Sequence, residues 1–451
     1  MSTQTHPDIR PGRLSPDEYL RRFSDANPRM TPAQALLEAE RCLYCFDAPC
    51  ASACPTHIDV PSFIRRIADA NLRGAARTIL DSNPLGGMCA RVCPTEVLCE
   101  QVCVRNTQEG KPVAIGRLQR HAVDAVLHES ATALFTRAAE SGKRIAIVGA
   151  GPAGLACAQT LSRLGHAVVM FDARPKAGGL NEYGLATYKT PEGFAQRELA
   201  WLLSIGGIEV RNNWKLGSAA QLATLRQEFD AVFLGLGLAG THQLGVPGEP
   251  FSGVQDAVDF IAALRQSSDL STLPVGRRVV VIGGGMTAID AAVQAKLLGA
   301  QKVDMVYRRG AEQMPASKAE QEWAQTRGVT IHHWLAPVEV LGIEGRACAV
   351  RFERQDLVDG KLVPSGEFET FEADMVLKAI GQQMLSSVLA DAGVALTAGR
   401  IATADDGATS VKGVWAGGDC RAGGLDLTVE AVAHGKQSAQ AIHAHLTRAV
   451  P

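Results

Sequence analysis

Cysteines are concentrated in one short stretch of the chain. Eight of the eleven lie between positions 42 and 103. They form two runs, namely Cys42, Cys45, Cys50 and Cys54, followed by Cys89, Cys93, Cys99 and Cys103. Cys54 and Cys93 each precede a proline, which stiffens the turn after a ligand. Such a density of thiols is typical of iron–sulfur ligation, in which thiolates bind iron.

Two other uses of these thiols have to be weighed. The Cys42-x2-Cys45 spacing also suits tetrahedral zinc, but zinc has no redox chemistry, and the dinucleotide loops described below call for a redox metal. Disulfides would require an oxidising compartment. The polar first residues contain no apolar core of a secretory signal, so we expect a cytoplasmic protein with reduced thiols.

Length and composition limit the remaining possibilities. A chain of 451 residues is too long for one core, so about three domains are expected. With 46% hydrophobic and 20% charged residues the composition is that of an ordinary globular protein. The formal charge of −2 gives no general attraction to nucleic acid or to anionic lipid. No run of 18 uninterrupted apolar residues is present, which argues against a membrane span.

The hydrophobic pattern changes from helical to strand-like near residue 144. Helices are expected from Thr31 to about Arg41, after Val60 with Phe63, Ile64, Ile67 and Ala68 on one face, from about Gly74 to Leu80, and from Ile115 to about Ala139. We therefore predict an α/β protein with two interleaved Rossmann-like domains after an all-helical iron–sulfur domain. The expected boundaries are 1–140 for the helical domain, 141–276 and 376–451 for an FAD-binding domain, and 277–375 for an inserted NAD(P)-binding domain.

The first dinucleotide loop follows a short buried strand that ends at Val148. Gly149, Gly151 and Gly154 form a G-x-G-x-x-G pattern that opens a helix. They permit a tight turn, a close approach of backbone amides to a pyrophosphate, and close helix–strand packing. Asp172, at the end of the next strand, is placed to bind ribose hydroxyls.

Later residues favour FAD over NAD at this loop. Gly179 would let the backbone pass close to a flavin, and Asp419 follows a second Gly-Gly pair near the C-terminus, where a carboxylate can bind a ribityl chain. Leu180 and Thr428 are further candidates for this site. Lys189 either hydrogen-bonds near the flavin ring or is an exposed loop lysine.

The second dinucleotide loop lies in the inserted domain. Its G-x-G-x-x-A pattern, again between a strand and a helix, supplies the candidate residues Gly283, Gly285, Thr287 and Ala288. The next strand ends in Arg308 and Arg309, at the place where an acidic residue would select NAD. Two guanidinium groups there can hold a 2′-phosphate, which favours NADP(H) and leaves NAD(H) open.

The order of these motifs resembles the electron-input half of dihydropyrimidine dehydrogenase and the small subunit of glutamate synthase. The resemblance covers about residues 35–445. It is most specific at Cys42–Cys50, Asn83–Gly86, Ala90–Glu96 and Ile115–Gln119. It is strongest towards the bacterial NAD(P)-dependent dihydropyrimidine dehydrogenase small subunits.

This resemblance implies two 4Fe–4S clusters and their ligands. One cluster would be bound by Cys42, Cys45, Cys50 and Cys103, and the other by Cys54, Cys93, Cys99 and the side-chain oxygen of Gln119. Spacing alone would make all eight cysteines cluster ligands, whereas the resemblance leaves Cys89 without a ligand role. Without the resemblance Gln119 would be an ordinary helical glutamine.

The resemblance also implies a function. The chain would pass electrons from NAD(P)H through FAD and two 4Fe–4S clusters to a separate FMN-bearing iron–sulfur subunit, in a heterotetramer that interconverts uracil or thymine with dihydropyrimidines. No residue of this chain is expected to act on the pyrimidine. The alternatives are a glutamate synthase small subunit, which shares every motif used here, and a stand-alone NAD(P)H diaphorase or ferredoxin reductase. A purely structural module would bind no coloured cofactor.

Overall fold

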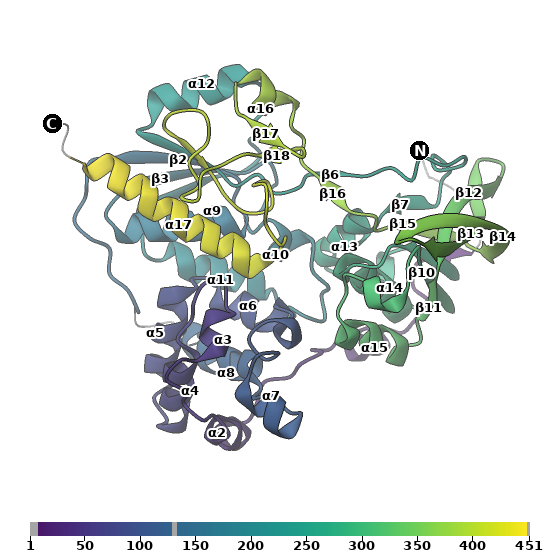
Figure 1. Cartoon of the computed structure of the whole chain (residues 1–451), viewed down its shortest axis with the longest axis horizontal. Helices are drawn as coiled ribbons and strands as arrows, with labels where there is room; N and C mark the ends of the chain where they lie inside the picture. The colour runs from purple at the N-terminus through teal and green to yellow at the C-terminus, as the bar shows by residue number, and fades with distance from the viewer. Residues whose placement is uncertain (1–7, 129–132, 449–451) are drawn as a thin grey trace. The chain divides into compact units, whose positions relative to one another are not determined.

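The computed structural model describes residues 8–128 and 133–448, which fall into two compact units. The larger unit comprises residues 27–182, 192–240 and 383–448, and the smaller unit comprises residues 8–26, 183–191 and 241–382. Figure 1 shows the elements of both. None of the described helices is long and apolar enough to cross a bilayer.

The cysteine region of the larger unit is helical. Its helices are α2 (Pro32–Glu40), α3 (Pro49–Ser52), α4 (Val60–Ala68), α5 (Leu72–Ser82), α6 (Gly86–Val92), α7 (Val104–Glu109) and α8 (Ile115–His128). Thr31 caps α2 through a capping box with Gln34, as its place before Pro32 suggests. In α4 the predicted apolar face is confirmed, because Phe63, Ile64 and Ile67 are buried.

The helix predicted from Ile115 to Ala139 is shorter than expected. The described part of α8 reaches His128, residues 129–132 lie outside the described residues, and residues 133–139 are not helical. Leu134 and Phe135 are instead buried in the core of the helical region, where Phe135 packs edge-on against Trp201. The apolar pattern that suggested a continued helix therefore belongs to a segment that packs without helical structure.

A five-stranded parallel sheet forms the rest of the larger unit. Its strand order is β19-β5-β2-β3-β4, with bounds Val414–Ala416, Ala231–Leu234, Arg144–Val148, Ala167–Phe171 and Ile208–Arg211. Residues of α9 (Pro152–Arg163) and α17 (Thr428–Thr447) share one hydrophobic core with alternate residues of β2 and β3. Residues of α12 (Ala219–Glu228) and α16 (Ser387–Asp391) share another core with the remaining strand residues. The sheet is thus covered on both faces, as expected for parallel strands.

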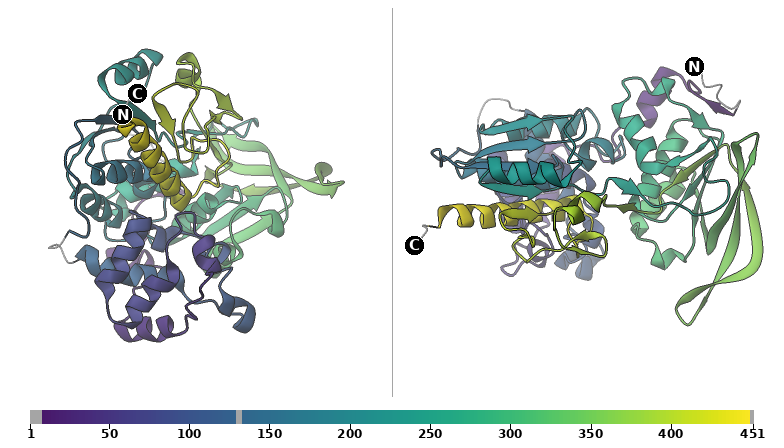
Figure 2. Two further views of the ribbon diagram at one scale, coloured as in Figure 1. Left: turned by 60° about the vertical axis from the view of Figure 1, so that its left-hand side comes forward. Right: turned by 90° about the horizontal axis from the view of Figure 1, so that it is seen from above.

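The helical region lies beside this sheet domain within the same unit. Helix α6 contacts both α17 and α11 (Phe194–Leu203), and in Figure 2 the cysteine-region helices lie next to α17. Leu85, just before α6, is buried in the core formed by α9 and α17. The cysteine region therefore packs directly on the sheet domain.

The smaller unit has its own parallel sheet, in the order β11-β10-β9-β15-β7. These strands span Thr330–His333, Lys302–Tyr307, Arg278–Ile282, Met375–Lys378 and Val254–Asp256, and are accompanied by α13 (Ala257–Gln266), α14 (Met286–Leu297) and α15 (Lys318–Thr326). An antiparallel sheet of β12 (Leu335–Ile343), β13 (Arg346–Val358) and β14 (Lys361–Glu372) follows β11. Near the N-terminus, β1 (Ile9–Arg10) pairs with β8 (Val275–Gly276), and α1 (Pro16–Arg22) follows.

The smaller unit extends beyond the predicted inserted domain of 277–375. Strand β7 pairs with β15, and α13 packs on α14, so residues 241–276 and 376–382 belong to this unit. The N-terminal residues 8–26 also belong to it and not to the helical region. A three-residue strand such as β7 carries too little periodicity to mark a boundary in the sequence.

Candidate functional site

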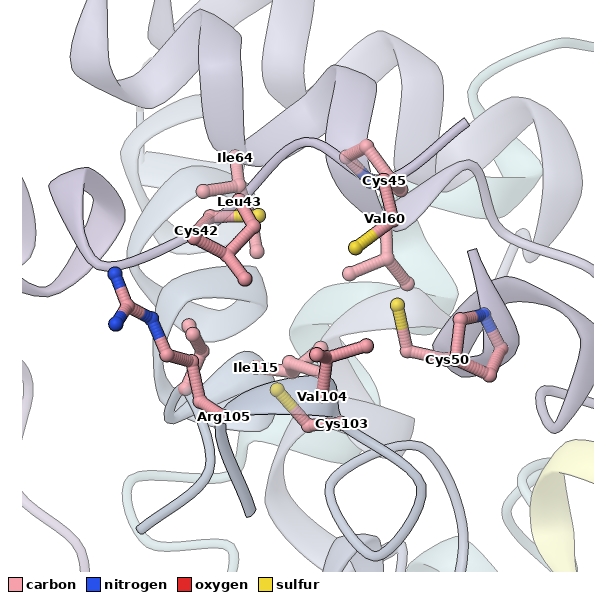
Figure 3. A pocket seen from close by; sticks show the side chains of 13 residues that line it. Cys42, Leu43, Cys45, Cys50, Val60, Ile64, Cys103, Val104, Arg105 and Ile115 are labelled. Carbon is pink, nitrogen blue, oxygen red and sulfur yellow. The ribbon is translucent and has the colours of Figure 1, made fainter. Parts of the chain in front are cut away.

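Four cysteines from separate elements line one pocket. Cys42 and Cys45 follow α2, Cys50 lies in α3, and Cys103 is the residue before α7. Figure 3 shows their sulfur atoms around a common space, with apolar side chains such as Val60, Ile64 and Ile115 also lining it. These are the four residues that the resemblance assigned to one cluster.

The pocket disfavours uncompensated thiolates. Burial raises the pKa of Cys42, and it raises the pKa of Cys50 to about 11. The neighbouring thiols add to both shifts, since each negative charge opposes the next. A cationic iron centre would relieve this repulsion, so the donor set and its apolar surroundings fit a 4Fe–4S cluster.

The second group of thiols lies next to the first. Burial is the main cause that raises the pKa of Cys99, and Cys54 and Cys50 contribute to the rise. A hydrogen bond with the buried Cys89 and burial raise the pKa of Cys93, with further contributions from Cys99 and Cys54. The structure therefore brings the predicted ligands Cys54, Cys93 and Cys99 together, and it places Cys89 at the same site.

Gln119 is held in one orientation by a hydrogen bond to α6. It is buried on α8, and its Nε2 donates a hydrogen bond of 2.7 Å to the carbonyl oxygen of Gly86, the first residue of α6. A carbonyl only accepts hydrogen bonds, so the amide nitrogen must face Gly86 and the amide oxygen is left for another partner. The start of α8 packs on the loop that carries Cys99, because the Gly116 N–H donates to Glu100 at 3.0 Å.

The first dinucleotide loop lies at the carboxyl end of β2. Gly149 has φ +100°, and a Cβ there would lie 2.2 Å from the carbonyl oxygen of Gly235. A Cβ on Gly154 would lie 2.0 Å from the carbonyl oxygen of Gly149. A Cβ on Gly179 would lie 2.6 Å from the Cα of Gly151, so the two glycine turns lie against each other. Only glycine permits these approaches.

Asp172 connects this loop to the end of β3. Its Oδ2 accepts the N–H of Ala150 at 2.7 Å, and its Oδ1 accepts the N–H of Arg174 at 2.8 Å. Each carboxylate oxygen has a second lone pair, so a ribose hydroxyl can still bind. The carboxylate therefore shapes the loop as well as being available to a ligand.

Asp419 and Thr428 lie at the same edge of the sheet, after β19. A Cβ on Gly418 would lie 2.9 Å from the Cβ of Ala153, so this turn packs on the start of α9. Burial raises the pKa of Asp419 to about 6, and no described residue donates a hydrogen bond to its carboxylate. Thr428 begins α17 and donates to Oδ1 of Asn181 at 3.3 Å, and Leu180 begins α10 (Leu180–Tyr183). The predicted FAD residues thus share one edge of one sheet, which is where such sheets bind nucleotides.

The second glycine loop follows β9 of the smaller unit. Gly283 has φ +145°, and a Cβ there would lie 2.2 Å from the carbonyl oxygen of Ala379. A Cβ on Gly285 would meet no atom within 4 Å, so the space beside this residue is open to a ligand. Thr287 lies in the first turn of α14, and Ala288 is fully buried.

Arg308 and Arg309 directly follow β10 and are exposed. Neither side chain forms a hydrogen bond or ion pair with any residue of the described chain. Tyr307 is fixed beside the loop, because its hydroxyl donates to the Gln313 carbonyl at 2.8 Å and its ring lies over Gly284. Both guanidinium groups are therefore available to an anionic ligand.

Lys189 is not an exposed loop lysine. Its Nζ lies 2.8 Å from Asp290 of α14 and 2.7 Å from Glu320 of α15, and only 13% of the side chain is exposed. These two carboxylates raise its pKa against the effect of burial. The lysine anchors residues 183–191 within the smaller unit.

The sequence did not reveal a buried carboxyl group next to α6. Glu198 of α11 accepts the N–H groups of Gly87 at 2.7 Å and Met88 at 3.1 Å. Burial raises its pKa to about 8, and these two donors and Arg91 limit the rise. A single glutamate in an amphipathic helix carries no sequence signal for this role; only the adjacent Gly86-Gly87 pair hinted at a close approach.

Comparison with known proteins places this geometry in a family. The family model described as dihydropyrimidine dehydrogenase domain II, 4Fe-4S cluster, matches residues 19–131, and the pyridine nucleotide-disulphide oxidoreductase model matches residues 143–435. The NAD-dependent dihydropyrimidine dehydrogenase subunit PreT of Salmonella typhimurium is 35% identical over 427 residues, which cover 95% of this chain and 98% of that protein. The NADPH glutamate synthase small chain of Escherichia coli is 33% identical over 445 residues and 93% of each chain.

Solved structures show the same fold in the sheet domains. FprA of Mycobacterium tuberculosis in complex with NADPH matches with a TM-score of 0.56 and 21% identity, over 67% of this chain and 84% of that one. Thioredoxin reductase of T. acidophilum matches with a TM-score of 0.51 and 22% identity, over 67% of this chain and 99% of that one. The predicted fold class is confirmed: a helical 4Fe–4S domain precedes two parallel-sheet Rossmann-like domains. The chain belongs to the iron–sulfur flavoprotein family that includes the dihydropyrimidine dehydrogenase subunit PreT and the glutamate synthase small chain, and it is an NAD(P)H-dependent FAD oxidoreductase.

Proposed function

We propose that this chain is the electron-input subunit of a dihydropyrimidine dehydrogenase. It would take electrons from NAD(P)H and deliver them to a separate subunit that carries FMN and iron–sulfur clusters and interconverts uracil or thymine with 5,6-dihydropyrimidines, in a cytoplasmic heterotetramer. The observation that carries the proposal is the pocket of Cys42, Cys45, Cys50 and Cys103 on the same polypeptide as two dinucleotide loops. The 35% identity to PreT over nearly the whole chain supports the choice of partner reaction.

The chain's own residues would bind and orient the groups that carry electrons. Gly149, Gly151, Gly154 and Gly179 let the backbone approach FAD, while Asp172 and Asp419 offer carboxylates to its ribose and ribityl hydroxyls. When bound, FAD accepts a hydride and 4Fe–4S clusters carry single electrons, chemistry that requires orientation more than acid–base catalysis.

We assign two clusters to the helical domain. Cys42, Cys45, Cys50 and Cys103 would hold the first. Cys54, Cys93, Cys99 and the Gln119 side-chain oxygen would hold the second. The hydrogen bond from Gln119 to Gly86 supports this oxygen over the Cys89 thiol as the fourth ligand, because it leaves the oxygen free to bind iron.

We propose that Arg308 and Arg309 bind the 2′-phosphate of NADP(H). Their exposure at the end of β10, without any partner in the described chain, supports this assignment. Charge-assisted hydrogen bonds contribute about 1.5–3 kcal/mol each, so Arg308→Ala should raise the KM for NADPH roughly tenfold or more and leave the KM for NADH nearly unchanged. Arg351→Ala, on the antiparallel sheet, serves as the control for loss of a positive charge. Equal use of NADPH by wild type and Arg308→Ala would remove the phosphate assignment.

A glutamate synthase small chain is the second candidate, because the Escherichia coli protein is 33% identical over 93% of each chain. Purification of the chain from its own cells, followed by two assays, separates the candidates. An FMN-containing partner and NAD(P)H-dependent reduction of uracil support the dihydropyrimidine dehydrogenase. A large glutamine-binding partner supports the glutamate synthase, and dye reduction without any partner indicates a stand-alone diaphorase.

A further inference from the structure

Two polar side chains of the sheet domain, Glu198 and Lys436, hold the segment that joins α5 to α6. Glu198 of α11 accepts the backbone N–H groups of Gly87 and Met88 at the start of α6. Lys436 of α17 donates to the carbonyl oxygens of Asp81 and Ser82 at the end of α5, at 2.9 and 2.6 Å. A helix start offers free N–H groups and a helix end offers free carbonyls, so each side chain has the matching polarity.

The contact at α6 is close-packed as well as hydrogen-bonded. A Cβ on Gly87 would lie 2.5 Å from the Phe194 ring and 2.7 Å from the Oε1 of Glu198. Arg91, one turn further along α6, lies 3.4 Å from the centre of the Phe194 ring and donates to the Gly87 carbonyl at 3.0 Å. Arg91 also pairs at 2.7 Å with the buried Asp124 of α8. The first turn of α6 is therefore fixed between α11 and α8.

The first turn of α6 also holds Gln119. The residue before Gly87 is Gly86, whose carbonyl oxygen accepts the Gln119 amide at 2.7 Å. A Cβ on Gly86 would lie 2.6 Å from Ile79, so the turn has little room to shift towards α5. The contact of Glu198 and the contact of Gln119 therefore fall on adjacent residues of one turn, Gly87 and Gly86.

We propose that Glu198 is a positioning residue for the second iron–sulfur site, acting through the first turn of α6 to hold the Gln119 amide with its oxygen towards the cluster. This inference rests on the proposed role of Gln119 as a ligand. It assigns to an FAD-domain helix a part in building a cluster of the helical domain, so the geometry of the second cluster depends on the docking of the two domains.

The test uses the full-length protein, purified anaerobically. Electron paramagnetic resonance spectra of the reduced protein are recorded, and a midpoint potential is measured for each cluster. We expect Glu198→Ala to shift the same cluster that Gln119→Leu shifts, and to leave the other cluster unchanged. A tenfold change in the reduction equilibrium is about 59 mV for one electron. In the double variant Glu198→Ala/Gln119→Leu the second change should add nothing, because both act on one ligand. Glu198→Gln should keep the wild-type spectrum, since its amide oxygen accepts the same N–H groups.

Two further variants distinguish a specific effect on the cluster from a general loss of stability. Leu202→Ala removes a buried side chain from the same helix and should lower stability without shifting either cluster. Gly87→Ala is compatible with a helix but pushes against Phe194 and Glu198, so it should reproduce the shift even if Glu198→Ala folds poorly.

The outcomes separate this inference from the proposed function. If Gln119→Leu shifts one cluster but Glu198→Ala and Gly87→Ala leave it unchanged, Glu198 has no positioning role. If Leu202→Ala causes the same shift as Glu198→Ala, the effect is general destabilisation and the inference is overturned. If Gln119→Leu changes neither cluster, or wild type holds only one cluster, the ligand assignment fails and the inference fails with it.

Discussion

The two cysteine sites lie side by side in one helical domain but are built differently. The first is lined by Cys42, Cys45, Cys50 and Cys103, all of which belong to the helical region. The second group lies beside α6, which contacts α11 and α17 of the sheet domain and is bonded to Glu198. The first site combines the closely spaced Cys42, Cys45 and Cys50 with the distant Cys103 inside the helical region. The second also depends on contacts with the sheet domain.

The largest effect expected from this comparison is the loss of one cluster. Cys50→Ser should remove the first cluster and about half of the bound iron, because Cys50 lines the first pocket. The second cluster should keep its spectrum, and the FAD content should not change. Iron and acid-labile sulfide analysis with low-temperature spectra measures both. Loss of all iron would mean that the two sites are not separate.

Two substitutions test the proposal that the Gln119 oxygen is the fourth ligand of a second cluster. Gln119→Leu should change the spectrum of one cluster, since it removes the oxygen that the bond to Gly86 leaves free. Cys89→Ser should leave both clusters intact. If Cys89→Ser loses iron while Gln119→Leu keeps the wild-type cluster spectra, the assignment in which all ligands are thiolates would be restored.

The pH dependence of stability should report the charge of Glu198. Its ordinary pKa of 4.5 rises to about 8 in the folded state because of burial, with Arg91 and Asp124 as the charged groups that face it. Between pH 4.5 and pH 8 the unfolded chain loses this proton while the folded chain keeps it, so rising pH favours unfolding. Compared with Glu198→Gln, wild type should lose about 1 kcal/mol of stability per pH unit over this range.

Thermal or chemical unfolding of the two proteins at pH 5.5, 6.5 and 7.5 gives this difference directly. A constant difference across the series would mean that the carboxyl group is already ionised at pH 5.5. In that case the hydrogen bonds from Gly87 and Met88, and not burial, would dominate its pKa.

The smallest effect is expected at Lys436, which contacts the end of α5. Lys436→Met leaves the carbonyls of Asp81 and Ser82 without their donor, which should cost about 1–2 kcal/mol of unfolding free energy. Lys412→Met, at an exposed position with no side-chain partner in the described chain, should change stability by less than about 0.5 kcal/mol. Equal values for the two variants would show that Lys436 does not hold α5.

The features that could be predicted from the sequence depend on local patterns, whereas the features that could not depend on distant contacts. The strand–glycine–helix patterns at Gly149 and Gly283 and the buried face of α4 are local, and the structure has them as expected. The extent of the smaller unit, the end of α8 and the ion pairs of Lys189 depend on distant partners. Glu198 belongs to this second class, since nothing near it in sequence shows that it reaches Gly87, 111 positions away.

The most direct test of the account is the anaerobic addition of NADPH, and separately of NADH, to the purified chain while its visible absorbance is recorded. We predict that the protein contains FAD, iron and acid-labile sulfide, and that flavin and iron–sulfur absorbance both bleach without any partner subunit. A protein without labile sulfide, or one whose absorbance does not change when either nucleotide is added, would contradict the account.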